Sequence, residues 1–137
     1  MRTAKEMYDF VIDNGYVNRV PKRWLKKHFE VVEQRLRSDE DVMFAFAGCN
    51  VGDLDMVGNF AYAITTKRIL MGKKKIIGEV TKSILLEHLN DVTFKKDFNF
   101  YTITIDTIKE KLVIRNNRKI NPNIELEMQD VLLQLNK

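Results

Sequence analysis

Two segments of the chain alternate large and small apolar residues, and this alternation restricts the folds open to it. In the first, Phe44 and Phe46 alternate with Ala45 and Ala47, and residues 60–64 read Phe-Ala-Tyr-Ala-Ile. Alternate residues of a β-strand point to opposite faces of a sheet, and a sheet with one face in water carries polar residues at every second position. Both faces of this sheet are therefore predicted to be covered, with the apolar helices that precede it as the natural cover.

Seven segments carry the signals of antiparallel strands separated by turns. The predicted strands span residues 42–51, 57–65, 68–71, 76–80, 83–94, 99–106 and 111–115. Turns are predicted at residues 52–55, 66–67 and 72–75, where Gly, Asp, Thr and Lys gather. Strands at this spacing are typical of a barrel or a sandwich.

Helices are predicted on both sides of the strands. Thr3 and Glu6 have capping-box spacing, and the first helix stops at Gly15. A second helix follows Pro21 and buries one apolar face, formed by Leu25, Phe29, Val32 and Leu36. We therefore predict a helical extension over residues 1–38 that packs on a β-rich domain over residues 39–137.

The last residues of the chain predict a helix that caps the sheet. Asn121 can cap it and Pro122 fits its first turn. Its apolar stripe consists of Ile124, Met128, Leu132 and Leu135. Burial of each such side chain contributes about 1.5–3 kcal/mol, so this helix is expected to be structural.

Seven antiparallel strands followed by one amphipathic helix resemble the pleckstrin-homology (PH) superfold, an α+β fold with a bent sheet or barrel capped by a C-terminal helix. Residues 59–71, with Thr65, Lys67 and Arg68, resemble the Thr-x-Lys-Arg hairpin of bacterial PH-like domains of the YokE type. Residues 38–42 and 86–94 add weaker matches. The resemblance covers residues 38–137, and the two leading helices resemble those of some Firmicute and prophage members. It implies a small cytoplasmic bacterial domain without an assigned molecular role.

One departure from lipid-binding relatives bears on function. Phosphoinositide-binding PH domains carry several Lys and Arg around the first hairpin. Here residues 49–56 contain Asp53 and Asp55 and no basic residue, and carboxylates repel a phosphorylated headgroup. Phosphoinositide binding is therefore not expected.

Signatures of catalysis are missing from the sequence. It contains no P-loop, GxGxxG, HExxH or GxSxG motif. His28 and His88 are its two histidines, no Cys/His spacing suits zinc, and Asp53 with Asp55 would make a poor cation site. We expect a non-enzyme without catalytic residues, cofactor or metal, in which His28 has a packed or partly exposed role.

The single cysteine and the start of the chain bear on location. Cys49 has no partner within the chain and is interpreted as a small buried strand residue, which suits a reducing compartment. No targeting signal and no apolar run long enough to span a bilayer is visible. The expected location is the cytoplasm.

Two basic clusters are the remaining candidates for recognition. The net charge is +4, and residues 1–38 hold nine basic and five acidic side chains. One cluster lies at residues 22–27, around Trp24, and the other is Lys73–Lys75 at a predicted hairpin tip. Either can be explained as a packed amphipathic helix or a solubilising tip, so neither alone indicates nucleic-acid binding.

These observations favour a non-catalytic module that binds a protein partner or a second copy of the chain. PH-like folds often bind peptides in the groove between a late strand and the terminal helix, here residues 83–94 and the helix from Pro122. The alternative is an anionic surface, membrane or nucleic acid, bound through the basic helix and Lys73–Lys75.

Overall fold

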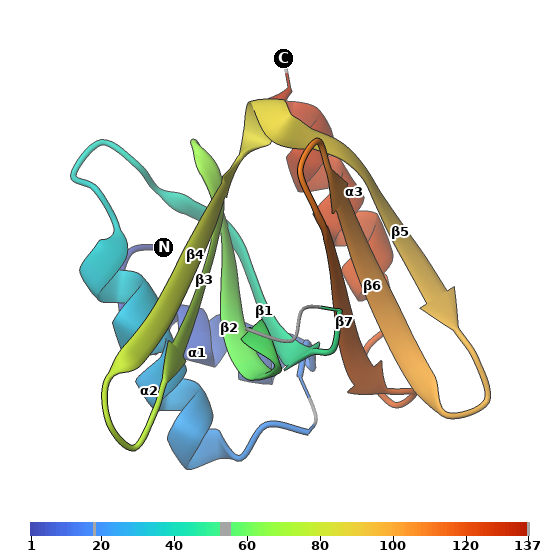
Figure 1. Ribbon diagram of the computed structural model, residues 1–137, viewed down its shortest axis with the longest axis horizontal. Helices are drawn as coiled ribbons and strands as arrows, with labels where there is room; N and C mark the ends of the chain where they lie inside the picture. The colour runs from blue at the N-terminus through green and yellow to red at the C-terminus, as the bar shows by residue number, and fades with distance from the viewer. Residues whose placement is uncertain (18, 53–55, 137) are drawn as a thin grey trace.

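The computed structural model describes residues 1–17, 19–52 and 56–136 and has the predicted α+β architecture (Figure 1). Two helices, seven strands and a final helix follow one another along the chain. The elements are α1 (Ala4–Asn14), α2 (Lys22–Arg35), β1 (Val42–Asn50), β2 (Gly58–Thr65), β3 (Arg68–Lys74), β4 (Glu79–Leu85), the short 3-10 helix η2 (Leu86–His88), β5 (Leu89–Lys96), β6 (Phe100–Thr107), β7 (Lys111–Asn117) and α3 (Asn123–Leu135).

The strands form one antiparallel sheet in the order β4-β3-β2-β1-β7-β6-β5. This order confirms the predicted strand number, but the sheet is open over the described residues, with β4 and β5 as its edges, and is not a closed barrel. β1 and β7 pair only at Cys49↔Arg115 and Asn50↔Ile114. The two halves of the sheet splay apart below η2, with α1 and α2 against the β1–β4 half (Figure 1).

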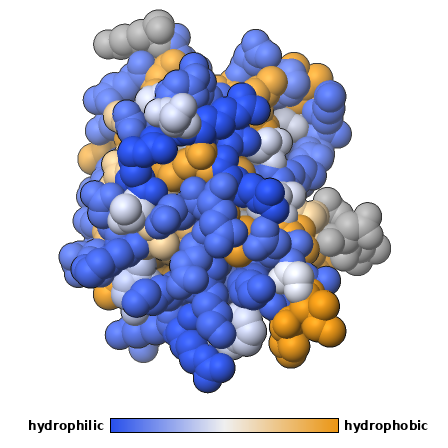
Figure 2. Space-filling view, turned by 90° about the vertical axis from the view of Figure 1, so that its left-hand side faces the viewer, coloured by the Kyte–Doolittle hydropathy of each residue, from blue (hydrophilic) through white to orange (hydrophobic). Residues whose placement is uncertain are grey.

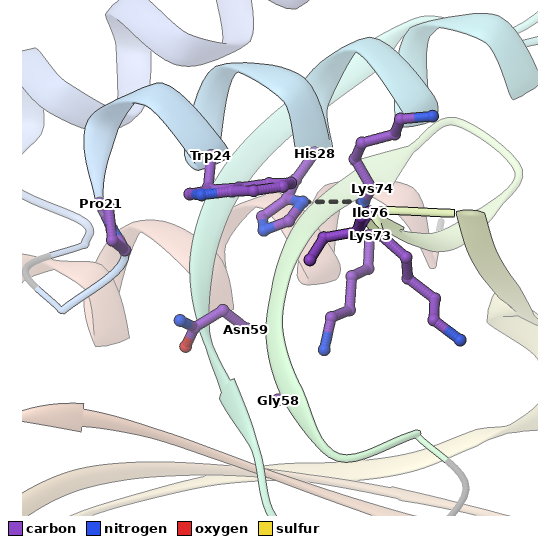
Figure 3. Close-up of a pocket in the computed structure, with 9 residues that line it drawn as sticks. Pro21, Trp24, His28, Gly58, Asn59, Lys73, Lys74 and Ile76 are labelled. Carbon is purple, nitrogen blue, oxygen red and sulfur yellow. Dashed lines mark hydrogen bonds between the residues drawn. The ribbon is translucent and has the colours of Figure 1, made fainter. Parts of the chain in front are cut away.

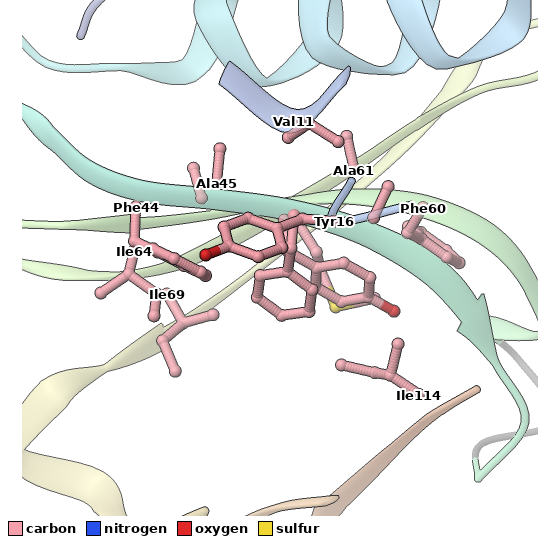
Figure 4. Close-up of a cluster of buried hydrophobic side chains, with 14 of the residues drawn as sticks. Val11, Tyr16, Phe44, Ala45, Phe60, Ala61, Ile64, Ile69 and Ile114 are labelled. Atoms are coloured by element: carbon pink, nitrogen blue, oxygen red, sulfur yellow. The ribbon is translucent and has the colours of Figure 1, made fainter. Parts of the chain in front are cut away.

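The alternation of large and small residues separates two packed faces, as predicted. Ala61 pairs with Gly72 in the sheet, and a Cβ on Gly72 would lie 3.0 Å from Val32 Cγ2 and 3.1 Å from Val31 Cγ1 of α2. The small residues therefore let α2 approach the sheet closely. The large residues form the opposite face, where Phe46 stacks on Tyr62 with ring centroids 4.8 Å apart. Figure 4 shows Ala45 on the helix side of the sheet and Phe44 and Ile64 on the other side.

Gly72→Val is expected to lower the free energy of unfolding by about 1–3 kcal/mol, because the added side chain must displace α2 from a packed interface. Urea unfolding of the variant measures this loss. Ser83→Val, on the exposed face of edge strand β4, is the matched control and should stay within about 0.5 kcal/mol of the parent. Equal stability of the two variants would contradict the close packing of α2.

The segment between α1 and α2 joins the N-terminal helices to the rest of the fold. The Tyr16 carbonyl accepts a hydrogen bond from Ala47 N–H of β1 at 3.3 Å, and Gly15 O accepts one from Asn121 N–H at 3.0 Å. The fully buried Tyr16 ring packs on Phe44 with centroids 5.3 Å apart, and its hydroxyl donates to Glu127 of α3 at 2.6 Å. This segment therefore connects the N-terminal helices to both β1 and α3.

The Thr-x-Lys-Arg hairpin is built around a buried carboxylate. Arg68 lies alongside Glu40, with Nη2 2.8 Å from Oε1, and Thr65 Oγ1 donates to Oε2 at 2.8 Å. The Arg68 side chain is 12% exposed and that of Glu40 is fully buried. Arg68 is thus one half of a buried ion pair, whereas Lys67 stays half-exposed near Asp39.

Three predicted boundaries in the middle of the chain are wrong. β3 continues through Lys74 where a turn was predicted at residues 72–75, because Gly72 makes room for α2. The turn lies at residues 75–78 and is closed by Lys75 N–H donating to Gly78 O at 3.0 Å. The strand predicted at 76–80 begins at Glu79, and the segment predicted as one strand over 83–94 is divided by η2 between β4 and β5.

Candidate functional site

The fold brings the two basic clusters of the sequence to one surface. α2 packs along β3, so the first turns of α2 lie beside the β3–β4 hairpin (Figure 3). Between them is a pocket of about 470 Å³, which we call the basic pocket. It is lined by Pro21, Trp24, His28, Gly58, Asn59, Lys73, Lys74, Lys75 and Ile76.

His28 forms the inner wall of the basic pocket. It is 3% exposed, and its Nδ1 accepts a hydrogen bond from Lys74 N–H at 2.9 Å (Figure 3). Burial, with the nearby charge of Lys73, lowers the pKa of His28 to about 4. The ring is therefore neutral at pH 7, with its proton on Nε2 as a donor, and no acceptor for that proton is found among the described residues. Of the two expected roles of His28, packed or partly exposed, the structure shows the packed one.

Aromatic rings position the ammonium groups around the pocket. Lys73 Nζ lies 5.5 Å from the Phe60 ring centroid and donates to Val57 O at 3.2 Å. Lys27 Nζ lies 4.8 Å from the ring of the half-buried Trp24. Such cation–π contacts hold a lysine in place without neutralising its charge.

The tip of the β3–β4 hairpin stands beside the pocket and is apolar. Ile76 and Ile77 are 90% and 87% exposed, although turns usually carry polar residues. In the space-filling view an apolar projection stands at the lower edge of a mostly hydrophilic face, where this hairpin lies (Figure 2). The hairpin tip was predicted at residues 72–75 and was therefore expected to carry lysines. In the structure the tip carries Ile76 and Ile77.

A second groove lies at the predicted position between β5 and α3. It has a volume of about 330 Å³, and we call it the β5–α3 groove. Its lining is Leu89, Asn90, Asp91, Val92, Gln129, Leu132, Leu133 and Asn136. Leu132 is buried at its base, whereas Leu133 is 67% exposed.

The edge strand beside this groove is partly protected. β5 pairs with β6 on one side only and has a register shift between Leu89 and Asp91. The Asp91 carboxylate accepts Val92 N–H at 2.8 Å. A bulge and a charged side chain are the usual means by which an exposed edge avoids indiscriminate pairing.

The remaining sequence candidates do not assemble into a site. His28 on α2 and His88 in η2 lie in different elements, and among the described residues no three His, Cys, Asp or Glu could hold a metal. Cys49 lies in β1 as predicted but is half-buried and not fully buried. Asp53 and Asp55 lie outside the described residues, so the argument against phosphoinositides stays a prediction.

No helix in the described part of the chain is long and apolar enough to cross a membrane.

Comparisons with known proteins agree with this fold. A family model described as Bacterial PH domain matches residues 36–126. The crystal structure of the C-terminal domain of an unknown protein from Leishmania infantum is similar, with a TM-score of 0.52 and 14% identity over 82% of this chain and 94% of that one. A DUF1696 family protein with a pleckstrin-homology domain from Shewanella loihica PV-4 gives a TM-score of 0.51 and 10% identity over 77% and 90%. No curated protein sequence gives a significant match.

Proposed function

Because this chain belongs to the bacterial PH domain family, we propose that it is a non-catalytic interaction module that binds an extended protein segment, or a second copy of itself, in the β5–α3 groove. One observation carries the proposal: the edge strand β5 lies beside an apolar helix face with a groove between them. An extended peptide can add to such an edge through its main chain and place alternate side chains in the groove.

The lining of the groove defines the segment that it would accept. Leu89, Val92 and Leu133 offer apolar contacts, and side-chain amides surround them. Asp91 is the one charged residue among the described residues that line the groove. A segment with alternating apolar residues and a basic residue near Asp91 fits this surface, and its carbonyl would replace the Asp91 carboxylate as the acceptor for Val92 N–H.

Leu133→Glu is expected to abolish this binding while leaving the fold unchanged, because Leu133 is mostly exposed and lies in the groove. Self-association is measured by light scattering, and partner binding by retention of proteins from the source cells on the immobilised chain. Leu126→Glu is the matched control, since Leu126 is 59% exposed on the same helix and does not line the groove. A monomer that retains no protein, or equal behaviour of the two variants, would contradict the proposal.

Three finer assignments accompany the proposed function. Residues 59–71 support a place among the YokE-type members of the family. The unpaired Cys49 supports a cytoplasmic location. Residues 1–38 are proposed as an extension to a PH-like domain over residues 39–137, tied to it through Tyr16.

A second candidate function is binding to an anionic surface. A separate observation favours it: Lys73, Lys74 and Lys75 line one pocket with Trp24. Lys27, from the same cluster as Trp24, lies beside Lys74 in a neighbouring hollow. If their positive charge is used for binding, the affinity for an anionic surface falls as the salt concentration rises.

A further inference from the structure

We infer that the basic pocket and the β3–β4 tip form one docking surface for an anionic lipid bilayer, in which Ile76 and Ile77 enter the interfacial layer. This inference rests on the second candidate function and adds to it the class of partner and the mode of contact. It concerns a surface distinct from the β5–α3 groove.

The two isoleucines carry the first part of the argument. Their exposed fractions, 90% and 87%, are the highest of the large apolar side chains in the described part of the chain. The turn that bears them is already closed by the Lys75–Gly78 hydrogen bond, so their side chains are not needed to form it. An apolar tip that projects from a hydrophilic face indicates an interaction site in which its side chains are removed from water.

The residues around the tip are mostly basic. Lys73, Lys74 and Lys75 precede the isoleucines directly, and Lys27 reaches the same region from α2. Among the described residues, two carboxylates lie nearby, Glu30 and Glu79, and Glu79 is paired with Arg35 at 2.6 Å. The described residues of this surface therefore carry a positive excess, and each lysine near an anionic membrane adds about 1 kcal/mol of attraction, or roughly a fivefold increase in affinity.

The basic pocket supplies a position for one headgroup. His28 Nε2–H has no acceptor among the described residues, and Lys73 also lines the pocket. A phosphate group in the pocket would accept from His28 and be attracted by the charge of Lys73. Trp24 at the rim has the amphipathic ring that favours the membrane interface.

A bilayer fits these features better than a nucleic acid does. The phosphate backbone of a nucleic acid would pair with the lysines but would leave Ile76 and Ile77 in water. An anionic bilayer pairs with the lysines through its headgroups and removes the two isoleucines from water. The tip is convex and projects from the molecule, so it suits insertion into a deformable layer.

The single tryptophan of the chain allows a test without a label, since Trp24 lines the pocket. We expect the intact protein to sediment with phosphatidylcholine vesicles that contain phosphatidylglycerol, with a blue shift of tryptophan emission, and not with phosphatidylcholine alone. Ile76→Ser with Ile77→Ser should lower the partition coefficient at least tenfold, on the order expected for losing two inserted side chains. Lys75→Glu should lower it about fivefold or more.

Phe98→Ser with Ile108→Ser is the matched control, because these residues are 84% and 65% exposed in other turns. This control should bind vesicles like the parent. Absence of vesicle binding at low salt, or equal binding of the tip variant, would overturn the inference. If duplex DNA binds in a salt-dependent manner and vesicles do not, the second candidate function survives and the lipid inference fails. If neither binds, both fail, and the β5–α3 groove is unaffected.

Discussion

Arg68→Ala is expected to lower the free energy of unfolding by about 3–5 kcal/mol, because it leaves the Glu40 carboxylate buried without its cation. Urea unfolding at neutral pH measures this loss. Lys67→Ala is the matched control from the same hairpin: Lys67 faces Asp39 at 3.4 Å with both side chains at least half-exposed, and its loss should cost less than about 1 kcal/mol. Equal stability of the two variants would contradict a structural role for the buried pair.

The same pair makes stability depend on pH. Burial alone would raise the pKa of Glu40, but hydrogen bonds from Arg68, the Arg37 N–H and Thr65, with the charge of Arg68, outweigh it and lower the pKa to about 2. A depressed pKa in the folded state stabilises the fold above the unfolded value of 4.5, and the contribution, about 3 kcal/mol, is lost as the pH falls from 4.5 toward 2. Glu40→Gln should remove this part of the acid sensitivity.

The second large effect concerns Tyr16. Tyr16→Ala is expected to destabilise the fold by about 3–5 kcal/mol, because a fully buried ring between β1 and α3 is lost. Tyr16→Phe keeps the ring and removes the hydrogen bond to Glu127, which should cost about 1.5 kcal/mol. Thermal unfolding measures both.

Tyr8→Phe is the matched control for the hydroxyl, because no hydrogen bond of the Tyr8 hydroxyl is found among the described residues. It should leave the unfolding temperature unchanged. If Tyr16→Ala unfolds at the parent temperature, the segment between α1 and α2 is a surface connection and does not join the two parts of the fold.

The elements of this fold could be predicted because their signals are local. The alternation at Phe44–Ala47 and at residues 60–64 predicted a sheet covered on both faces, and the spacing of the capping-box residues placed the start of α1 correctly. The apolar stripe after Pro122 predicted α3. Each of these patterns lies within a single helix or a single strand.

The errors arose where one residue type serves two purposes. Glycine usually marks a turn, but Gly72 lies within β3, where its lack of a side chain lets α2 pack closely. That role depends on Val31 and Val32, which are distant in the sequence. Isoleucines favour strands, yet Ile76 and Ile77 form an exposed tip. Propensity alone could not separate these cases.

One of the two candidate sites could be predicted from the sequence, and the other could not. The β5–α3 groove followed from the resemblance to the PH superfold, so its position was available from the sequence. The basic pocket was not, because Trp24 and Lys73–Lys75 belong to clusters that were recognised separately, and only the packing of α2 on β3 brings them together. Tyr16 was missed because it lies between two helices, outside either periodic pattern.

The proposed function is tested most directly by photo-crosslinking within the source cells. A photoreactive phenylalanine analogue replaces Leu133 in the β5–α3 groove or, as a control, Leu126 on the same helix. The groove position should give discrete adducts with another protein or a second copy of the chain, and the control position should not. Absence of adducts at position 133, or the same adducts at both positions, would contradict the assignment of this groove as a binding site.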